Sequence, residues 1–145
     1  MKLSRILLPV DGSSYSNNAI DHAIYLAGLS GARVTAVCCY EWLGGLTEIV
    51  GSVAEELKEK MRLQAEAVLE EAARKLTDNN IAHDTRPVSG APGRMLSNLA
   101  KSKEFDLIIM GSHGHSDIAG LFLGSVTHKV LNTIYCPVLV VPENP

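Results

Sequence analysis

The sequence predicts an α/β protein, a three-layer sandwich in which a parallel sheet is covered by helices on both faces. Short apolar runs alternate with stretches of helical periodicity, and four of the five runs contain almost no polar residue. Strands buried on both faces have this composition, whereas strands with one solvated face alternate. The repeated strand–helix order over 145 residues predicts a single domain, residues 1–145, with right-handed crossovers.

Five apolar runs are the candidate strands. The third run is more polar and alternates, as the edge strand of a sheet does, and the other four are nearly continuous. In chain order the runs cover residues 5–10, 32–40, 81–89, 105–110 and 137–142.

The first gap between the runs has the pattern of an amphipathic helix. Ser13 or Ser14 can cap its N-terminus, and the glycines Gly28 and Gly31 are expected to end it. Its apolar residues recur at helical spacing and are expected to face the sheet: Ala19, Ile20, Ala23 and Ala27.

The other three gaps carry helix signals of their own. Residues 52–55 have the form of a capping box, and the polar residues 78–80 end the long helix that follows, whose charged residues are expected on a solvated face. Pro92 suits the first turn of the next helix, and Ser125 begins the last one.

Charge and composition exclude several classes of function. The formal net charge is −3 and the pI is near 5.9, whereas a nucleic-acid binder needs a basic face, so no nucleic-acid partner is expected. The apolar runs are far shorter than the ~18–20 residues that span a bilayer, so no membrane association is expected. Cys38, Cys39 and Cys136 have neither metal nor disulfide spacing, which predicts reduced thiols in a cytoplasmic protein.

A glycine-rich loop from Gly111 to Ser125 is the most informative segment. It begins where an apolar strand ends and finishes where a helix begins. Glycine lets backbone amides approach an anion closely, and a helix N-terminus offers N–H groups with a partial positive charge. Gly111 and Gly114 are expected to shape the turn, and Gly124 and Ser125 to direct amides toward a phosphate. A loop built only for tight turns is the alternative. Four features in order, namely a strand end, Gly-x2-Gly, Gly-Ser and a helix start, favour phosphate binding.

The chain resembles the universal stress protein family from residue 2 to residue 142. The most specific match is Gly-x2-Gly-x9-Gly-[Ser/Thr], the ATP-binding signature of that family, which is met by Gly111, Gly114, Gly124 and Ser125. The family contains members that keep this signature and bind ATP, and members that lack it and do not. The chain resembles the first group.

This resemblance implies a Rossmann-like sheet of the adenine nucleotide alpha-hydrolase type, with five parallel strands in the order 3-2-1-4-5. Strands 1 and 4 are then neighbours where the winding reverses, and ligands bind outside the carboxyl ends of strands at such a position. The resemblance implies an adenine nucleotide, ATP first, with Mg²⁺ contacted through Asp11. The residues that it assigns to the nucleotide are Pro9, Val10, Asp11, Val37 or Cys38, Met110, Gly111, His113, Gly114, Gly124, Ser125, Val126 and Thr127.

Some of these residues also have simpler explanations. Asp11 lies in an Asp-Gly-Ser sequence, where an aspartate is often a turn residue, and the two roles are compatible. His113 and His115 could form a metal pair, but such a site needs two further ligands and none is evident nearby. His113 is therefore expected to face the phosphates and His115 to be solvent-exposed.

The loop lacks the groups that phosphoryl transfer needs. The chain has no P-loop lysine, and no Lys or Arg lies between Gly111 and Thr127. The sequence therefore favours a nucleotide-dependent regulator in the stress response, with slow hydrolysis or none. A weak ATPase or an autophosphorylating phosphotransferase is the alternative, with Ser112, Ser116 or Ser125 as the acceptor. A nucleotide-free structural dimer is a third hypothesis, against which the intact signature argues. The sequence does not separate ATP from AMP, ADP or a cyclic nucleotide.

The last strand is expected to form an interface. It is apolar and lies at the end of the expected strand order, and an uncovered apolar edge is a template for pairing. Two copies that meet in an antiparallel manner would satisfy both edges about one two-fold axis. Similar family members pair in this way, so a homodimer is expected through Val138, Leu139, Val140 and Val141.

Overall fold

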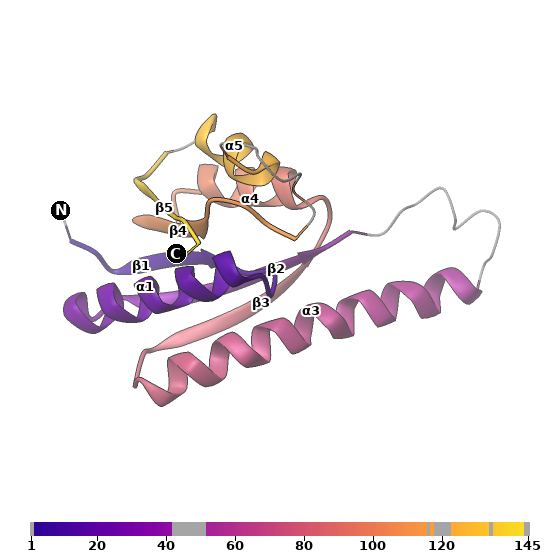
Figure 1. The fold of residues 1–145 in the computed structure, drawn as a ribbon, viewed down its shortest axis with the longest axis horizontal. Helices are drawn as coiled ribbons and strands as arrows, with labels where there is room; N and C mark the ends of the chain where they lie inside the picture. The colour runs from indigo at the N-terminus through magenta and orange to yellow at the C-terminus, as the bar shows by residue number, and fades with distance from the viewer. Residues whose placement is uncertain (1, 42–51, 116, 118–122, 134, 144–145) are drawn as a thin grey trace.

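The computed structural model describes all residues except 1, 42–51, 116, 118–122, 134 and 144–145. Strands and helices alternate along the described chain as the sequence predicts (Figure 1). The elements are β1 (Arg5–Pro9), α1 (Ser14–Ser30), β2 (Arg33–Tyr40), α3 (Ser52–Asp78), β3 (His83–Ser89), α4 (Pro92–Lys101), β4 (Leu107–Gly111), α5 (Ser125–Leu131) and β5 (Val138–Val141).

The five strands form one parallel sheet in the order β3-β2-β1-β4-β5. This confirms the expected fold class and strand order. In the register of the sheet, Ile6 of β1 lies between Val34 of β2 and Leu107 of β4. The first and fourth strands are therefore neighbours, although about a hundred residues separate them in sequence.

Helices cover both faces of this sheet, as the apolar runs predict. In β1, Ile6 and Leu8 belong to the core shared with α1 and α3, and Leu7 belongs to the core shared with α4 and α5. All three side chains are completely buried. In Figure 1, α1 and α3 lie on one side of the sheet and α4 and α5 on the other.

The two edge strands differ from the central ones. β3 alternates between half-buried and exposed residues, as its polar alternation predicts. β5 was expected to be buried on both faces, and this was wrong: Val138, Leu139 and Val140 stay half-buried. The reason is its position, since a strand at the edge has a neighbour on one side only.

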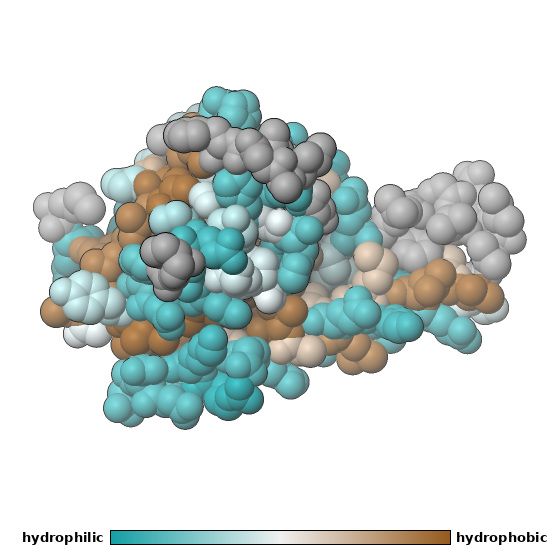
Figure 2. Space-filling view, viewed as in Figure 1, coloured by the Kyte–Doolittle hydropathy of each residue, from teal (hydrophilic) through white to brown (hydrophobic). Residues whose placement is uncertain are grey.

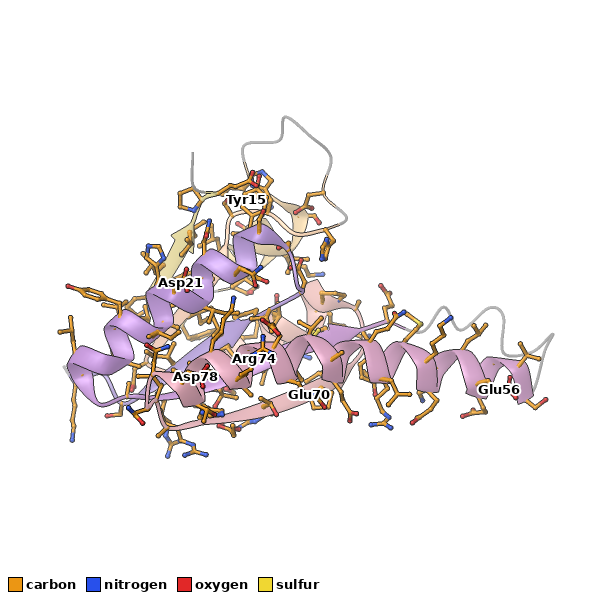
Figure 3. All side chains as sticks on the ribbon, turned by 60° about the horizontal axis from the view of Figure 1, so that its bottom comes forward. Tyr15, Asp21, Glu56, Glu70, Arg74 and Asp78 are labelled. Atoms are coloured by element: carbon orange, nitrogen blue, oxygen red, sulfur yellow. The ribbon has the colours of Figure 1, made fainter. Side chains whose placement is uncertain are left out.

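The long helix α3 extends beyond the sheet. Its first turns project from the body in Figure 1, and hydrophobic surface lies along this end of the helix in Figure 2. Val53 and Leu57, which belong to these turns, are 45% and 41% exposed. Charged side chains such as Glu56, Glu70 and Arg74 are spread along the helix (Figure 3). Ion pairs between residues three or four apart within the helix confirm the expected solvated face. No helix in the described part of the chain is both long and apolar enough to cross a membrane.

The helix ends correct one expectation. Ser13 is the N-cap of α1, and its hydroxyl accepts a hydrogen bond from the Ser16 N–H. Gly31 is the C-cap in a left-handed conformation, with φ 75°. Gly28, which was expected to help end the helix, lies inside it, because the chain stays helical to Ser30.

These two glycines predict opposite effects of the same substitution. A Cβ on either residue would meet no atom within 4 Å, so only backbone conformation differs. Gly28→Ala should raise the free energy of unfolding by up to about 1 kcal/mol, because alanine is the better helix former. Gly31→Ala should lower it by about 1 kcal/mol, because the left-handed conformation strains a residue with a Cβ. Urea unfolding of both variants checks this, and a shift of the same sign in both would contradict it.

Candidate functional site

A cavity of about 240 Å³ lies at the carboxyl ends of β1, β2 and β4. β1 leads into α1 on one face of the sheet, and β4 leads through the glycine loop to α5 on the opposite face. Because these two connections leave toward opposite faces of the sheet, they leave a space at the carboxyl ends of the neighbouring strands β1 and β4. A ligand crevice is expected at this position of an open parallel sheet.

The cavity gathers most of the residues that the sequence singles out. Gly124 is not among the residues that line it; this residue is the N-cap of α5 and donates its N–H to the Ser112 carbonyl. Cys38, the alternative to Val37, points into the core on the α1 side and does not line it. The candidates that do line it are Pro9, Val10, Asp11, Val37, Met110, Gly111, His113, Gly114, Ser125, Val126 and Thr127.

The sequence reasoning missed several lining residues. Cys39 had a usable signal, because it lies two residues after Val37 and alternate strand residues share a face. Pro92 and Leu96 reach the cavity from α4, a separate helix that carries no local sign of it. The remaining residues are in loops or at a helix start: Ser16, His115 and Asp117.

One wall of the cavity is apolar and fixed. Val37, Leu96 and Met110 are each at most 5% exposed and belong to the core cluster on the α4 side. Cys39 adds a thiol, whose pKa is raised to about 12 by burial and by the neighbouring Cys38. The thiol is therefore protonated at neutral pH, and this wall suits a flat, uncharged group.

Asp11 joins the end of β1 to the glycine loop. Its Oδ1 accepts a hydrogen bond from the Ser13 N–H (2.9 Å), which is the turn role that the sequence left open. Its Oδ2 accepts from the His115 N–H (3.0 Å), across a sequence separation of 104 residues. The carboxylate thus holds the loop of β4 against the turn that begins α1.

The signature positions need glycine because a Cβ there would collide with neighbouring atoms, and not because their backbone has a positive φ. A Cβ on Gly111 would lie 2.7 Å from the Tyr15 Cβ and 3.1 Å from the Tyr15 carbonyl carbon, so α1 packs directly on the end of β4. A Cβ on Gly114 would lie 2.7 Å from the Asp11 Oδ2. A Cβ on Gly124 would lie 2.1 Å from the Asp117 Oδ2 and 3.0 Å from the His113 Cα.

Asp117 links both ends of the loop. Its Oδ2 accepts a hydrogen bond from the Gly114 N–H (2.6 Å), and its Oδ1 accepts from the N–H and the hydroxyl of Ser125 (3.2 Å each). Partial burial acts to raise the pKa of Asp117, but these hydrogen bonds and His113 outweigh it and lower the pKa below its ordinary value. The carboxylate is therefore ionised at neutral pH.

Two hydroxyl groups of the loop have partners inside the protein. The Thr127 hydroxyl is buried and donates to the Gly111 carbonyl (2.8 Å), so it ties α5 to β4. The Ser112 Oγ lies 2.9 Å from the His113 Nδ1. The His113 ring lines the cavity and packs on Tyr15, with 5.1 Å between the ring centroids.

The charges around the cavity are unusual for a phosphate site. No Lys or Arg is among the described residues that line it, and two carboxylates, Asp11 and Asp117, are. Both lie beside Gly114, since a Cβ there would be 2.7 Å from one carboxylate and 3.8 Å from the other. Among the described residues, no group of three or more His, Cys, Asp or Glu side chains could hold a metal ion.

Comparisons with known proteins agree with this geometry. The model of the universal stress protein family matches residues 2–142. Universal stress protein YxiE from Bacillus subtilis is 31% identical, over 95% of this chain and 98% of its own. Universal stress protein MJ0531 from Methanocaldococcus jannaschii is 30% identical, over 96% of this chain and 82% of its own.

Solved structures share the fold over the whole chain. The structure of protein MJ0577 has a TM-score of 0.87 at 28% identity, and the likeness covers 100% of this chain and 99% of that one. A universal stress protein solved in complex with cAMP has a TM-score of 0.72 at 29% identity, covering 99% of this chain and 100% of that one. With its sheet order, its glycine signature and a family match over nearly every residue, the chain belongs to the universal stress protein family.

Proposed function

We propose that this protein binds an adenine nucleotide in the cavity at the ends of β1, β2 and β4, with ATP as the ligand that its signature indicates. It acts as a nucleotide-dependent regulator in the stress response, as a homodimer in the cytoplasm. The observation that carries the proposal is the convergence of three separate strand ends and the glycine loop on one cavity.

The cavity has two parts that suit the two parts of a nucleotide. The apolar wall of Val37, Cys39, Leu96 and Met110 suits a flat base. The glycine loop lines the same cavity, and its Gly114 and Ser125 N–H groups, which donate to the Asp117 carboxylate, are donors of the kind that bind an anion. The neighbour that was solved with cAMP supports an adenine base. Three free cysteines support a reducing compartment such as the cytoplasm.

The described residues fit a magnesium ion that arrives with the nucleotide rather than a resident one. Both oxygens of Asp11 already accept hydrogen bonds from backbone N–H groups, and no cluster of three metal-binding side chains is present in the described chain. Mg²⁺ is commonly held by one or two carboxylates together with substrate phosphates. Asp11 is the residue proposed to contact it, and the ion would supply charge neutralisation for the phosphates.

Two matched substitutions that each add one negative charge test nucleotide binding. Gly124→Asp adds a carboxylate at the N-cap of α5, next to Ser125 and crowding Asp117, so its charge lies close to the proposed phosphate position and ATP affinity should fall by at least about tenfold. Gly28→Asp adds the same charge at an exposed position on α1 with open space around it, and should leave ATP affinity unchanged. Calorimetry measures both, with circular dichroism to check the fold. Equal affinity for ATP in both variants and the parent protein would contradict the proposal.

One contact favours the alternative, an autophosphorylating enzyme or a weak ATPase. Ser112 and His113 form a hydroxyl–imidazole pair, in which His113 lines the cavity and Ser112 is buried. Among the other candidate acceptors, Ser125 donates its hydroxyl to Asp117, and Ser116 lies outside the described residues. Against this alternative, the described lining contains no Lys or Arg to stabilise a transferring phosphoryl group.

Steady-state turnover separates the two functions. Without a cationic clamp, hydrolysis of ATP should be far slower than the ~10 s⁻¹ that is typical of enzymes. A phosphate-release assay with Mg²⁺ measures this. Turnover near that value, lost in Ser112→Ala, would place the protein among the enzymes.

The dimer is proposed to form through β5, an edge strand of the sheet. The Pro137 carbonyl accepts a hydrogen bond from Ile108 of β4, and the Val141 carbonyl accepts one from Ser112, the residue that follows β4. Because main-chain groups alternate in direction along a strand, the N–H and C=O groups of Val138 and Val140 point to the open edge. After the strand, the Pro142 carbonyl accepts from Asn18 and the Glu143 carboxylate accepts from Ser14, so the tail is held toward α1.

A proline scan of β5 tests this interface. Val140→Pro removes an N–H that points outward and should weaken the dimer, while the pairing with β4 stays intact. Leu139→Pro removes an N–H that points toward β4 and should lower the stability of the fold itself. Sedimentation at micromolar concentration and thermal unfolding read out the two effects. A monomeric parent protein, or a dimer unchanged by Val140→Pro, would contradict the proposed interface.

A further inference from the structure

The donors of the glycine loop already bind an anion, and that anion belongs to the protein. Asp117 accepts from the N–H of Gly114 and from the N–H and hydroxyl of Ser125. These two residues are signature positions in the loop that the proposed function assigns to the nucleotide phosphates. A phosphate oxygen and the Asp117 carboxylate cannot use the same donors at the same time.

The surroundings of Asp117 strengthen this competition. Asp11 also lies beside Gly114, and no Lys or Arg lines the described cavity, so each phosphate added to a ligand brings negative charge toward two carboxylates. Like charges at short range repel, and the repulsion is larger in a partly buried site than in water. Partial burial acts to raise the pKa of Asp117, but the hydrogen bonds from Gly114 and Ser125, with a smaller contribution from His113, lower that pKa below its ordinary value.

We propose that Asp117 is a specificity-determining residue that competes with the nucleotide phosphates for the Gly114 and Ser125 donors. Its carboxylate opposes ligands in proportion to their phosphate charge, so it penalises ATP more than AMP and leaves adenosine unaffected. This inference rests on the proposed function, because it assumes that the base of an adenine nucleotide occupies the neighbouring apolar wall. It predicts that ATP binds only when Asp117 gives up its hydrogen bonds.

Replacement of Asp117 tests the inference against a matched control. Asp117→Asn keeps the shape of the side chain and removes its charge, and Asp117→Ala removes the acceptor altogether. Asp21→Asn makes the same change in net charge on the exposed surface of α1, six residues after Tyr15, which packs on the loop at Gly111 and His113. Calorimetric titrations use adenosine, AMP and ATP at one ionic strength, first with a chelator and then with Mg²⁺.

In chelator, Asp117→Asn should raise the affinity for ATP by about tenfold or more, raise that for AMP less, and leave that for adenosine unchanged. Asp117→Ala should act in the same direction, and Asp21→Asn should match the parent protein. Weaker or unchanged ATP binding in both Asp117 variants would overturn the inference and show a residue that only positions the loop. An equal gain for adenosine would overturn it as well. Weaker binding of Mg-ATP to Asp117→Asn would identify Asp117 as a metal ligand and overturn it too.

Inorganic triphosphate separates failure of the inference from failure of the proposed function. If Asp117→Asn binds triphosphate and the parent protein does not, Asp117 competes for an anion position whether or not adenine binds. If triphosphate behaves in this way but no protein binds adenosine, AMP or ATP, the proposed function is wrong and the anion competition stands. If no variant binds triphosphate or any adenine nucleotide, both are wrong.

Discussion

The pairing of β1 with β4 is the constraint on which the site depends. These strands lie side by side, but their connections leave on opposite faces of the sheet, β1 into α1 and β4 through the glycine loop into α5. The backbone therefore opens above the two strand ends, and β2 supplies the third wall through Val37 and Cys39. The cavity follows from the topology of the sheet, and its chemistry follows from the few residues at the strand ends.

The glycine signature serves the packing of the protein as well as any ligand. Gly111 lets α1 come into contact with the end of β4 at Tyr15, and Gly114 leaves room for the Asp11 carboxylate. Gly124 leaves room for Asp117 and for the backbone at His113. The same spacing that keeps side chains away from a phosphate thus also keeps them away from neighbouring protein atoms. Substitution of these glycines will change stability and binding together, so variants on facing side chains separate the two more cleanly.

Much of the fold could be predicted from local patterns. The apolar runs locate the strands, because a strand buried on both faces has no polar face, and Ser13 and Pro92 lie at the expected helix starts. The half-burial of β5 could not be predicted from its composition, since burial at an edge depends on which neighbour is missing. Gly28 was also ambiguous, because glycine inside a helix and glycine at its end look alike in sequence.

The candidate site was predictable where residues follow a strand end. Val10, Asp11 and Gly111 are fixed by the ends of β1 and β4, and strand alternation could have selected Cys39 over Cys38. Leu96 comes from α4 and depends on how that helix packs on the sheet. The role of Asp117 depends on hydrogen bonds between its carboxylate and the N–H groups of Gly114 and Ser125, and spacing alone does not reveal them.

The most direct test of the nucleotide site is a titration of isotope-labelled protein with AMP, followed through the backbone amide resonances. AMP carries both the base and one phosphate, so the resonances of Gly114 and Ser125 should shift together with those of Val10 and Cys39, and saturate at one ligand per chain. Shifts that cluster elsewhere, for example along α3, or no shifts at millimolar AMP, would contradict an adenine nucleotide site at the ends of β1, β2 and β4.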